Sequence, residues 1–150
     1  MANKLEVKDL RISFRTVSGK LKAVRDINFT LQEGETLAIV GESGSGKSAT
    51  SKTILGISAA NTIIEGGEIL YDGKDLLKIN EDEMYKIRGN EISVIFQEPM
   101  TSLNPVFTIE KQIAESYIVH QHMDKKEAYK KAVEMLAAVK IPNPEAVAKQ

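Results

Sequence analysis

The stretch GESGSGKS, residues 41–48, decides how this chain folds, because it fits the pattern G-x-x-x-x-G-K-[ST]. Its glycines let the backbone bend so that successive amide N–H groups point into one concavity, which suits anionic oxygens. Lys47 adds a point charge that can reach the β- and γ-phosphates of a nucleotide. The Ser48 hydroxyl can ligate Mg²⁺, a hard ion that prefers oxygen. The motif therefore predicts a site for a nucleoside triphosphate and Mg²⁺.

The residues on either side of this loop are of the kinds that the motif requires. The run TLAIV, residues 36–40, shows no alternation, which is typical of a strand covered on both faces in a parallel sheet. A helix is expected over residues 47–57, with Ile54 and Leu55 on its buried side, and its N-terminal amides favour negative charge. The alternative is a flexible Gly/Ser loop with an incidental lysine, and the strand–loop–helix order argues against it.

The first third of the chain has the pattern of a β-hairpin. Apolar and polar residues alternate over residues 5–14, and the phase slips by one between Val7 and Leu10, which predicts a bulge. A turn is expected at residues 18–19. Alternation resumes over residues 27–31, so we expect a second strand, antiparallel to the first.

After the loop helix the pattern is mixed and then helical. Gly66-Gly67 and Asp72-Gly73 bracket a short predicted strand over residues 68–71. Asn80, with Glu83 three residues later, is an N-cap signature for a short helix. The run ISVIF, residues 92–96, is typical of a second buried strand.

From Thr108 to about Lys140 the pattern is helical, and Asp124 is expected to cap the second of two helices. The predicted apolar face of that helix consists of Ala128, Ala132, Met135, Leu136 and Val139. Pro142 and Pro144 are expected to end it.

Composition excludes several classes of protein. A chain of 150 residues is one ordinary domain or most of one. Lys plus Arg number 20 and Asp plus Glu 21, so the basic excess of a general nucleic-acid binder is absent. The chain has no cysteine, and no apolar run approaches the roughly 20 residues that cross a bilayer. The N-terminus has no apolar core for a signal peptide, so we expect neither a secreted nor a membrane-spanning chain.

Three stretches together resemble the ATP-binding subunits of ABC transporters: TLAIV with GESGSGKS, then GGEILYDGKDL, then ISVIFQEPMTSLNP. FQEPMTSLNP, residues 96–105, is similar to the branch that imports oligopeptides and dipeptides, together with its nickel-import relatives. The resemblance runs over essentially all of the chain. It implies an α/β fold, a P-loop NTPase core with an antiparallel β part at the N-terminus and an all-helical part at the C-terminus. Residues 1–97 would form the β part and core, and residues 98–150 the exit of the Q-loop and the start of the helical subdomain.

The resemblance also assigns roles to residues. Phe14 would stack on adenine, although a core phenylalanine in an alternating strand is the alternative. Gln97 sits at the family's Q-loop position and would touch Mg²⁺ or the attacking water; the alternative is a surface glutamine at a strand end. Ala49 stands where relatives often carry a hydroxyl, so an α-phosphate contact there would come from its backbone N–H. The full set for ATP is Phe14, Gly41, Glu42, Ser43, Gly44, Ser45, Gly46, Lys47, Ser48 and Ala49; Lys47 and Gln97 are assigned to catalysis, and Ser48 and Gln97 to Mg²⁺.

Other parts of the family's active site do not occur in these 150 residues. There is no LSGGQ-type signature loop, no apolar strand ending in Asp-Glu, and no switch histidine after such a strand. We therefore expect the chain to be the N-terminal portion of a longer subunit, with an incomplete sheet and no ATP hydrolysis of its own. The alternatives are a truncated module that binds ATP without turning it over, an importer of nickel or another small solute, and, more distantly, a soluble ABC protein of DNA repair or translation.

The resemblance implies partners and a place in the cell. Transmembrane permease subunits would dock on the loop from Gln97 to Pro105 and the helices after it, and a second nucleotide-binding subunit would complete a dimer. No nucleic acid is expected as a partner. The chain would lie on the cytoplasmic face of the cell membrane as a peripheral subunit.

Overall fold

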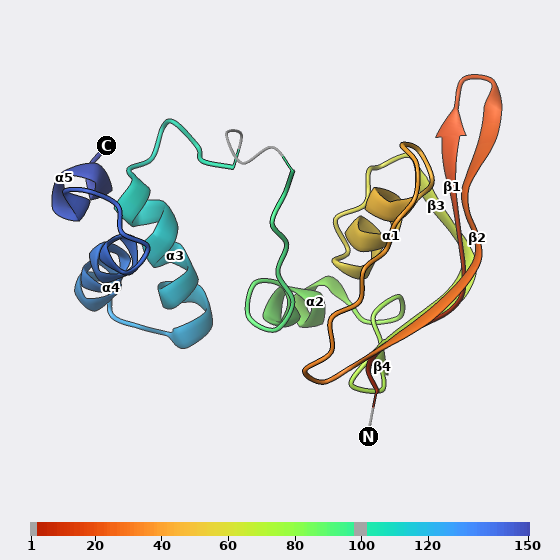
Figure 1. Ribbon diagram of the computed structural model, residues 1–150, viewed down its shortest axis with the longest axis horizontal. Helices are drawn as coiled ribbons and strands as arrows, with labels where there is room; N and C mark the ends of the chain where they lie inside the picture. The colour runs from red at the N-terminus through yellow and green to blue at the C-terminus, as the bar shows by residue number, and fades with distance from the viewer. Residues whose placement is uncertain (1–2, 98–101) are drawn as a thin grey trace. The chain divides into compact units, whose positions relative to one another are not determined.

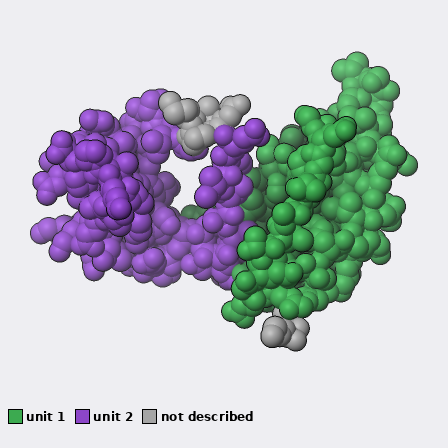
Figure 2. All heavy atoms as spheres, viewed as in Figure 1, with its two compact units in different colours: residues 1–85 green, residues 86–150 purple. Residues whose placement is uncertain are grey.

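A computed structural model describes residues 3–97 and 102–150 of the chain. The chain divides into two compact units, residues 1–85 and residues 86–150, which Figure 2 shows in different colours.

The first unit is built on a four-stranded antiparallel sheet in the order β2-β1-β3-β4 (Figure 1). The long strands β1 and β2 form the predicted hairpin, which is confirmed, and β1 also pairs with β3. The strand bounds are Asn3–Thr16 for β1, Gly19–Gln32 for β2, Thr62–Tyr71 for β3 and Lys74–Asp75 for β4.

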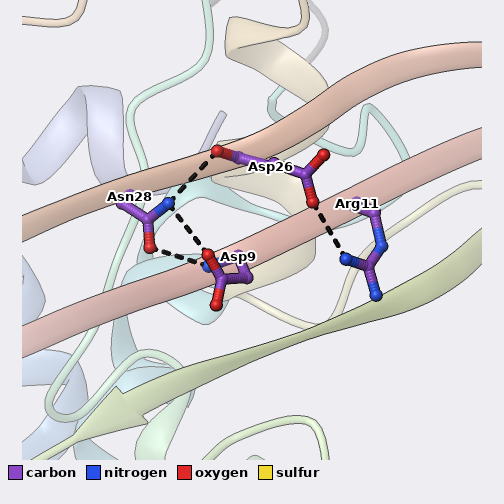
Figure 3. Close-up of polar contacts among 4 residues, drawn as sticks. All are labelled: Asp9, Arg11, Asp26 and Asn28. Carbon is purple, nitrogen blue, oxygen red and sulfur yellow. Dashed lines mark hydrogen bonds and ion pairs between the residues drawn. The ribbon is translucent and has the colours of Figure 1, made fainter.

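The bulge predicted between Val7 and Leu10 is confirmed by a shift in the register of β1 against β2. Asp9 lies in the bulge with φ 47°, and Asp26 on β2 has φ 48°. Figure 3 shows how Asn28 joins the two. The Asp9 N–H donates to Asn28 Oδ1 at 2.9 Å, and Asn28 Nδ2 donates to Asp9 Oδ1 at 3.1 Å and to Asp26 O at 3.2 Å. Arg11 Nη1 donates to Asp26 Oδ1 at 2.9 Å, so side chains stabilise the irregular part of the hairpin.

Strand β3 is longer than the predicted strand, because it continues through Gly66-Gly67 to Thr62. The prediction that these glycines bound a strand is wrong, and packing explains why they can lie inside one. A Cβ atom on Gly67 would lie 2.6 Å from Leu10 Cα, so only glycine allows β1 to pass this close. The core of the unit lies beside this contact, where Leu10, Ile12 and Ile69 are fully buried.

Helix α1 (Lys47–Ile54) follows the glycine-rich loop as predicted, although it is shorter than residues 47–57. It lies against the sheet in Figure 1. Leu55 is buried as expected, but the helix itself buries Thr50 and Thr53. Both threonine hydroxyls bond back to backbone oxygens, from Thr50 to Gly46 O at 3.0 Å and from Thr53 to Ala49 O at 2.8 Å, so their burial leaves no unsatisfied donor.

The two runs predicted as buried strands are not strands, and these predictions are wrong. Residues 36–40 have no regular secondary structure, and Val40 is 88% exposed. Residues 92–96 make only an isolated bridge from Ile92 to Arg88, and Ile95 is 97% exposed. A strand needs a partner for its backbone groups, and neither run finds one within residues 3–97 and 102–150.

Helix α2 (Glu81–Ile87) begins as the sequence predicts. The Glu83 N–H donates to Asn80 Oδ1 at 2.9 Å, which is the expected N-cap bond.

The second unit contains helices α3 (Ile109–Gln121), α4 (Lys125–Ala138) and α5 (Pro144–Ala148). The predicted cap of α4 is confirmed, since the Lys126 N–H donates to Asp124 Oδ2 at 2.9 Å. Small residues let α3 and α4 pack closely, with Ala114, Ala128 and Ala132 fully buried between larger neighbours.

Two details of the helical part differ from the prediction. Met135 and Val139 are 45% and 61% exposed, so the buried stripe of α4 is narrower than the predicted face. Pro144 does not end a helix but begins α5, because a helix's first residues need no intrahelical N–H donor. No helix within residues 3–97 and 102–150 has the length and apolar character needed to cross a membrane.

Candidate nucleotide-binding site

The loop at residues 41–48 bends through two glycines in the left-handed region. Gly44 has φ 81° and Gly46 has φ 94°, values that other L-residues adopt only with strain. Between them the Ser45 N–H donates to Glu42 O at 3.2 Å and closes a turn. Gly46 is the N-cap of α1, so the loop runs straight into the amide-rich start of the helix. The bend at the glycines and the helix that follows the loop are as predicted.

Lys47 lies with its ammonium group inside the loop. Nζ donates to Gly41 O at 2.7 Å, to Glu42 O at 2.8 Å and to Ser45 Oγ at 3.2 Å. The first turn of α1 contains no acidic residue, so no carboxylate there competes for the positive end of the helix. In the described contacts, the Lys47 ammonium group bonds only to neutral oxygens. An anionic oxygen that reaches the loop therefore contacts both the helix amides and this ammonium group.

Strand β2 fixes the position of the loop through Gly46. A Cβ atom on Gly46 would lie 2.7 Å from Ala23 O and 2.9 Å from Val24 Cγ2. The loop therefore packs on β2 at a point where no side chain fits. The sequence motif requires a glycine at position 46 but does not indicate this neighbour, because a local pattern carries no information on a contact between residues some twenty positions apart in the chain.

Two cavities adjoin the loop. The larger, about 740 Å³, extends along β2 and the run 37–40, and it reaches Ser45, Gly46 and Lys47. The smaller has a volume of about 150 Å³. Its lining consists of Phe14, Ser48, Ala49, Lys52, Ser58, Ala59 and Thr62.

The smaller cavity brings together residues that the sequence assigned to one ligand. Phe14, from β1, shares it with Ser48 and Ala49 of α1. Lys52 and Thr62 were not foreseen as part of it. Lys52 lies one helical turn after Ser48, a spacing that could have suggested it, whereas Thr62 enters because β3 pairs with β1 opposite Phe14.

The donor set near the loop fits Mg²⁺ only as a partner of a nucleotide. The Ser48 hydroxyl is a suitable hard oxygen ligand at the start of α1. The described ranges contain no group of three or more His, Cys, Asp or Glu side chains that could hold a metal by themselves. Mg²⁺ commonly takes few protein ligands and completes its shell with water and phosphate oxygens, so Ser48 fits this role.

Gln97 belongs to the second unit and is exposed. Its assigned contact with Mg²⁺ or water stays a prediction. Residues 98–101 of the predicted docking loop lie outside the described residues. Leu103, further along the loop, is 52% exposed, and Val106, which follows its last residue, is 81% exposed.

A loop of this geometry between an apolar run and a helix defines a P-loop nucleotide-binding protein. Residues 24–149 match the family model described as ABC transporter. The chain therefore belongs to the ABC transporter ATP-binding family, as the resemblance predicted.

Curated relatives support the same family. The chain is 54% identical over 142 residues to the dipeptide transport ATP-binding protein DppD of Lactococcus lactis subsp. cremoris, covering 94% of this chain and 41% of that protein. It is 54% identical over 142 residues to the oligopeptide transport ATP-binding protein OppD of Bacillus subtilis, covering 94% of this chain and 40% of that protein. The chain thus spans about two-fifths of the length of the curated relatives it matches.

Solved structures agree on the fold. A dimeric structure of MJ0796, a bacterial ABC transporter cassette, matches with a TM-score of 0.79 and 25% identity, over 97% of this chain and 60% of that chain. The post-hydrolysis state of the same cassette bound to ADP and Pi matches with a TM-score of 0.80 and 26% identity, over 97% and 61%. The predicted fold class, a P-loop ABC ATPase core with an N-terminal antiparallel β part and C-terminal helices, is confirmed.

Proposed function

We propose that this chain provides the ATP-binding part of a subunit that energises peptide import by an ABC transporter. The observation that carries the proposal is that the phosphate-binding loop, the start of α1 and Phe14 adjoin one another. The loop that holds Lys47 leads into α1, and Ser48 and Ala49 of α1 line the same cavity as Phe14. A triphosphate on the loop would thus have its base end directed to an aromatic side chain. The names of the relatives, which are dipeptide and oligopeptide transport proteins, support peptides as the imported class.

Within this proposal each assigned residue has a physical role. Residues 41–48 hold the β- and γ-phosphates through backbone amides and the Lys47 ammonium, and the Ala49 N–H is available to the α-phosphate. Ser48 contributes one oxygen to Mg²⁺, the ion that neutralises phosphate charge during phosphoryl transfer. Phe14 stacks on the base. Gln97 orients water or Mg²⁺ and connects the core to the helices that follow.

The partners proposed from the family are a second nucleotide-binding subunit and transmembrane permease subunits. The dimeric cassette among the solved structures supports the first. Docking of the permease on the loop from Gln97 to Pro105 and the helices after it would place the chain at the cytoplasmic face of the membrane. Gln97→Ala should then depress transport-coupled hydrolysis more than it weakens ATP binding, and unchanged coupling in a reconstituted transporter would remove this role.

A second candidate is a module that binds ATP without turnover. The observation that favours it is that the 150 residues contain neither an LSGGQ-type loop nor an apolar strand ending in Asp-Glu. Lys47 and Ser48 can position phosphates and Mg²⁺, but such positioning without a group that activates water leaves phosphoryl transfer poorly catalysed. Steady multiple turnover of ATP by the 150-residue chain would exclude this candidate, and binding without turnover would support it.

ATP titration of Lys47→Ala tests the binding site. The variant removes the cation that faces the loop, so ATP affinity should fall by about tenfold or more, as expected for a charge-assisted contact. Lys130→Ala, which removes the same charge from an exposed position in α4, serves as the matched control and should keep wild-type affinity. Equal ATP affinity in wild type and Lys47→Ala would overturn the site assignment.

A further inference from the structure

The register of the sheet places two residues beside Phe14 that the sequence motifs do not identify. Phe14 pairs with Leu21 on β2 and with Thr62 on β3. Directly opposed residues in an antiparallel pair share one face, with Cβ atoms about 4.5–5.5 Å apart. Leu21, Phe14 and Thr62 therefore form a row across three strands.

This row lies on the face of the sheet that carries the phosphate-binding loop. Ile12 and Phe14 are two residues apart in a stretch of β1 whose register against β3 is unbroken, so they share a face. Ile12 pairs with Val24, and Val24 Cγ2 lies 2.9 Å from the position of a Cβ on Gly46. The loop, Phe14 and Leu21 are thus on the same side, with β2 running from the loop to Leu21.

Leu21 is a large apolar side chain that is 59% exposed. A single exposed leucine is ordinary on a protein surface. Its position is the informative feature, because Leu21 is the cross-strand neighbour of Phe14 on the loop side of the sheet. Lys20 next to it holds Glu65 of β3 through an ion pair of 2.9 Å, which ties this end of β2 across β1 to β3.

We propose that Leu21 and Phe14 form a two-strand apolar platform for the nucleotide's base, on which Leu21 is a positioning residue that favours purines over pyrimidines. The proposal rests on the proposed function, since it concerns the base of the nucleotide whose phosphates the loop binds. Neighbouring strands lie about 4.8 Å apart, so the fused rings of a purine can cover both side chains. The single ring of a pyrimidine covers Phe14 and leaves Leu21 in water.

The platform predicts a specific pattern of affinities. Contact with Leu21 removes apolar area from water only when the ligand carries a purine. Removing the leucine side chain should therefore weaken purine nucleotides, change pyrimidine nucleotides little, and leave a triphosphate without a base unaffected. A merely structural role of Leu21 would instead lower all three affinities together.

The experiment measures the binding of ATP, CTP and inorganic tripolyphosphate to the full natural chain by calorimetric titration. Leu21→Ala should weaken ATP about fivefold, CTP by less than about twofold, and tripolyphosphate not at all. Leu21→Met, which keeps an apolar side chain of similar size, should retain ATP affinity. Val17→Ala is the matched control, because Val17 is a fully exposed apolar residue in the same hairpin but at its turn.

Each outcome separates this inference from the function on which it rests. If neither ATP nor tripolyphosphate binds wild type, the proposed function fails. If ATP binds more tightly than tripolyphosphate and Leu21→Ala keeps wild-type affinity for ATP, the platform is wrong while the ATP site stands. If Thr62→Val weakens ATP and Leu21→Ala does not, the base lies on the β3 side of Phe14, in the smaller cavity, and the inference is overturned.

Discussion

The β1–β3 part of the sheet and the run 36–40 contain similar apolar residues, but they differ in burial and in strand pairing. In the sheet Leu10, Ile12 and Ile69 are fully buried, and every strand has a hydrogen-bonded neighbour. In the run TLAIV, Ile39 is 50% and Val40 88% exposed, and its residues form no strand. Apolar character therefore does not by itself make a strand.

The difference comes from where each segment finds its partner. The β1–β2 hairpin closes through a turn at residues 17–18, so its pairing needs little loop closure. A run buried on both faces, as in a parallel sheet, needs neighbours that arrive through long crossovers. The run 36–40 and the run 92–96 find none within the described ranges.

The largest expected effect separates the two regions by stability. Leu10→Ala opens a cavity in the packed sheet and should lower the free energy of unfolding by about 2–5 kcal/mol. Val40→Ala removes methyl groups that already face water and should change it by less than about 0.5 kcal/mol. Urea unfolding of the 150-residue chain measures both. A comparable loss in the two variants would mean that residues 36–40 are packed in solution.

A second comparison concerns two glycines of the phosphate-binding loop. Both have positive φ, but a Cβ on Gly44 would meet open space, whereas a Cβ on Gly46 would lie 2.7 Å from Ala23 O. Gly44→Ala should cost about 1 kcal/mol of strain, and Gly46→Ala about 2–3 kcal/mol, because the loop must also move off β2. Unfolding and ATP titration of the two variants test this, and equal losses would show that β2 does not position the loop.

Local features could be predicted from the sequence because they depend on neighbours a few residues apart. The slip in alternation at Val7 and Leu10 predicted the bulge, and the spacing of Asn80 and Glu83 predicted the cap of α2. The loop at residues 41–48 was also predicted with its helix, since the motif itself contains the glycines that bend it.

Features that depend on distant partners could not be predicted. Strand β3 passes through Gly66-Gly67 because β1 approaches at Leu10, more than fifty residues earlier in the sequence. The position of Leu21 beside Phe14 follows from strand register, and the packing of Gly46 on Ala23 follows from how the loop lies on β2; a single sequence reveals neither. The same holds for the apolar runs at residues 36–40 and 92–96. Their composition indicates burial, but it does not indicate which segment would pack on them.

A third test asks whether the open run 36–40 pairs with another molecule. Unpaired apolar segments invite association between chains. Val40→Lys should therefore weaken self-association of the 150-residue chain about tenfold in dissociation constant, or about 1.4 kcal/mol. Val17→Lys introduces the same charge at another exposed valine, in the hairpin turn, and should leave association unchanged. Light scattering over a concentration series measures it, and equal association of wild type and Val40→Lys would show that this run is not the contact.

The smallest expected effect concerns the ion pair that ties the hairpin end to β3. A hydrogen bond from Lys20 lowers the pKa of Glu65 below its ordinary value of 4.5, so the pair adds stability above that value and loses it as pH falls through the folded-state pKa. Because Lys20 is 59% exposed, the contribution is small. Wild type should therefore be slightly more stable than Glu65→Gln near neutral pH, and the two should converge below the lowered pKa. Glu33→Gln makes the same change at the exposed turn after β2, and as the control it should leave stability near neutral pH unchanged. If the difference in melting temperature between wild type and Glu65→Gln is the same at every pH, the ion pair does not hold the hairpin that carries Leu21.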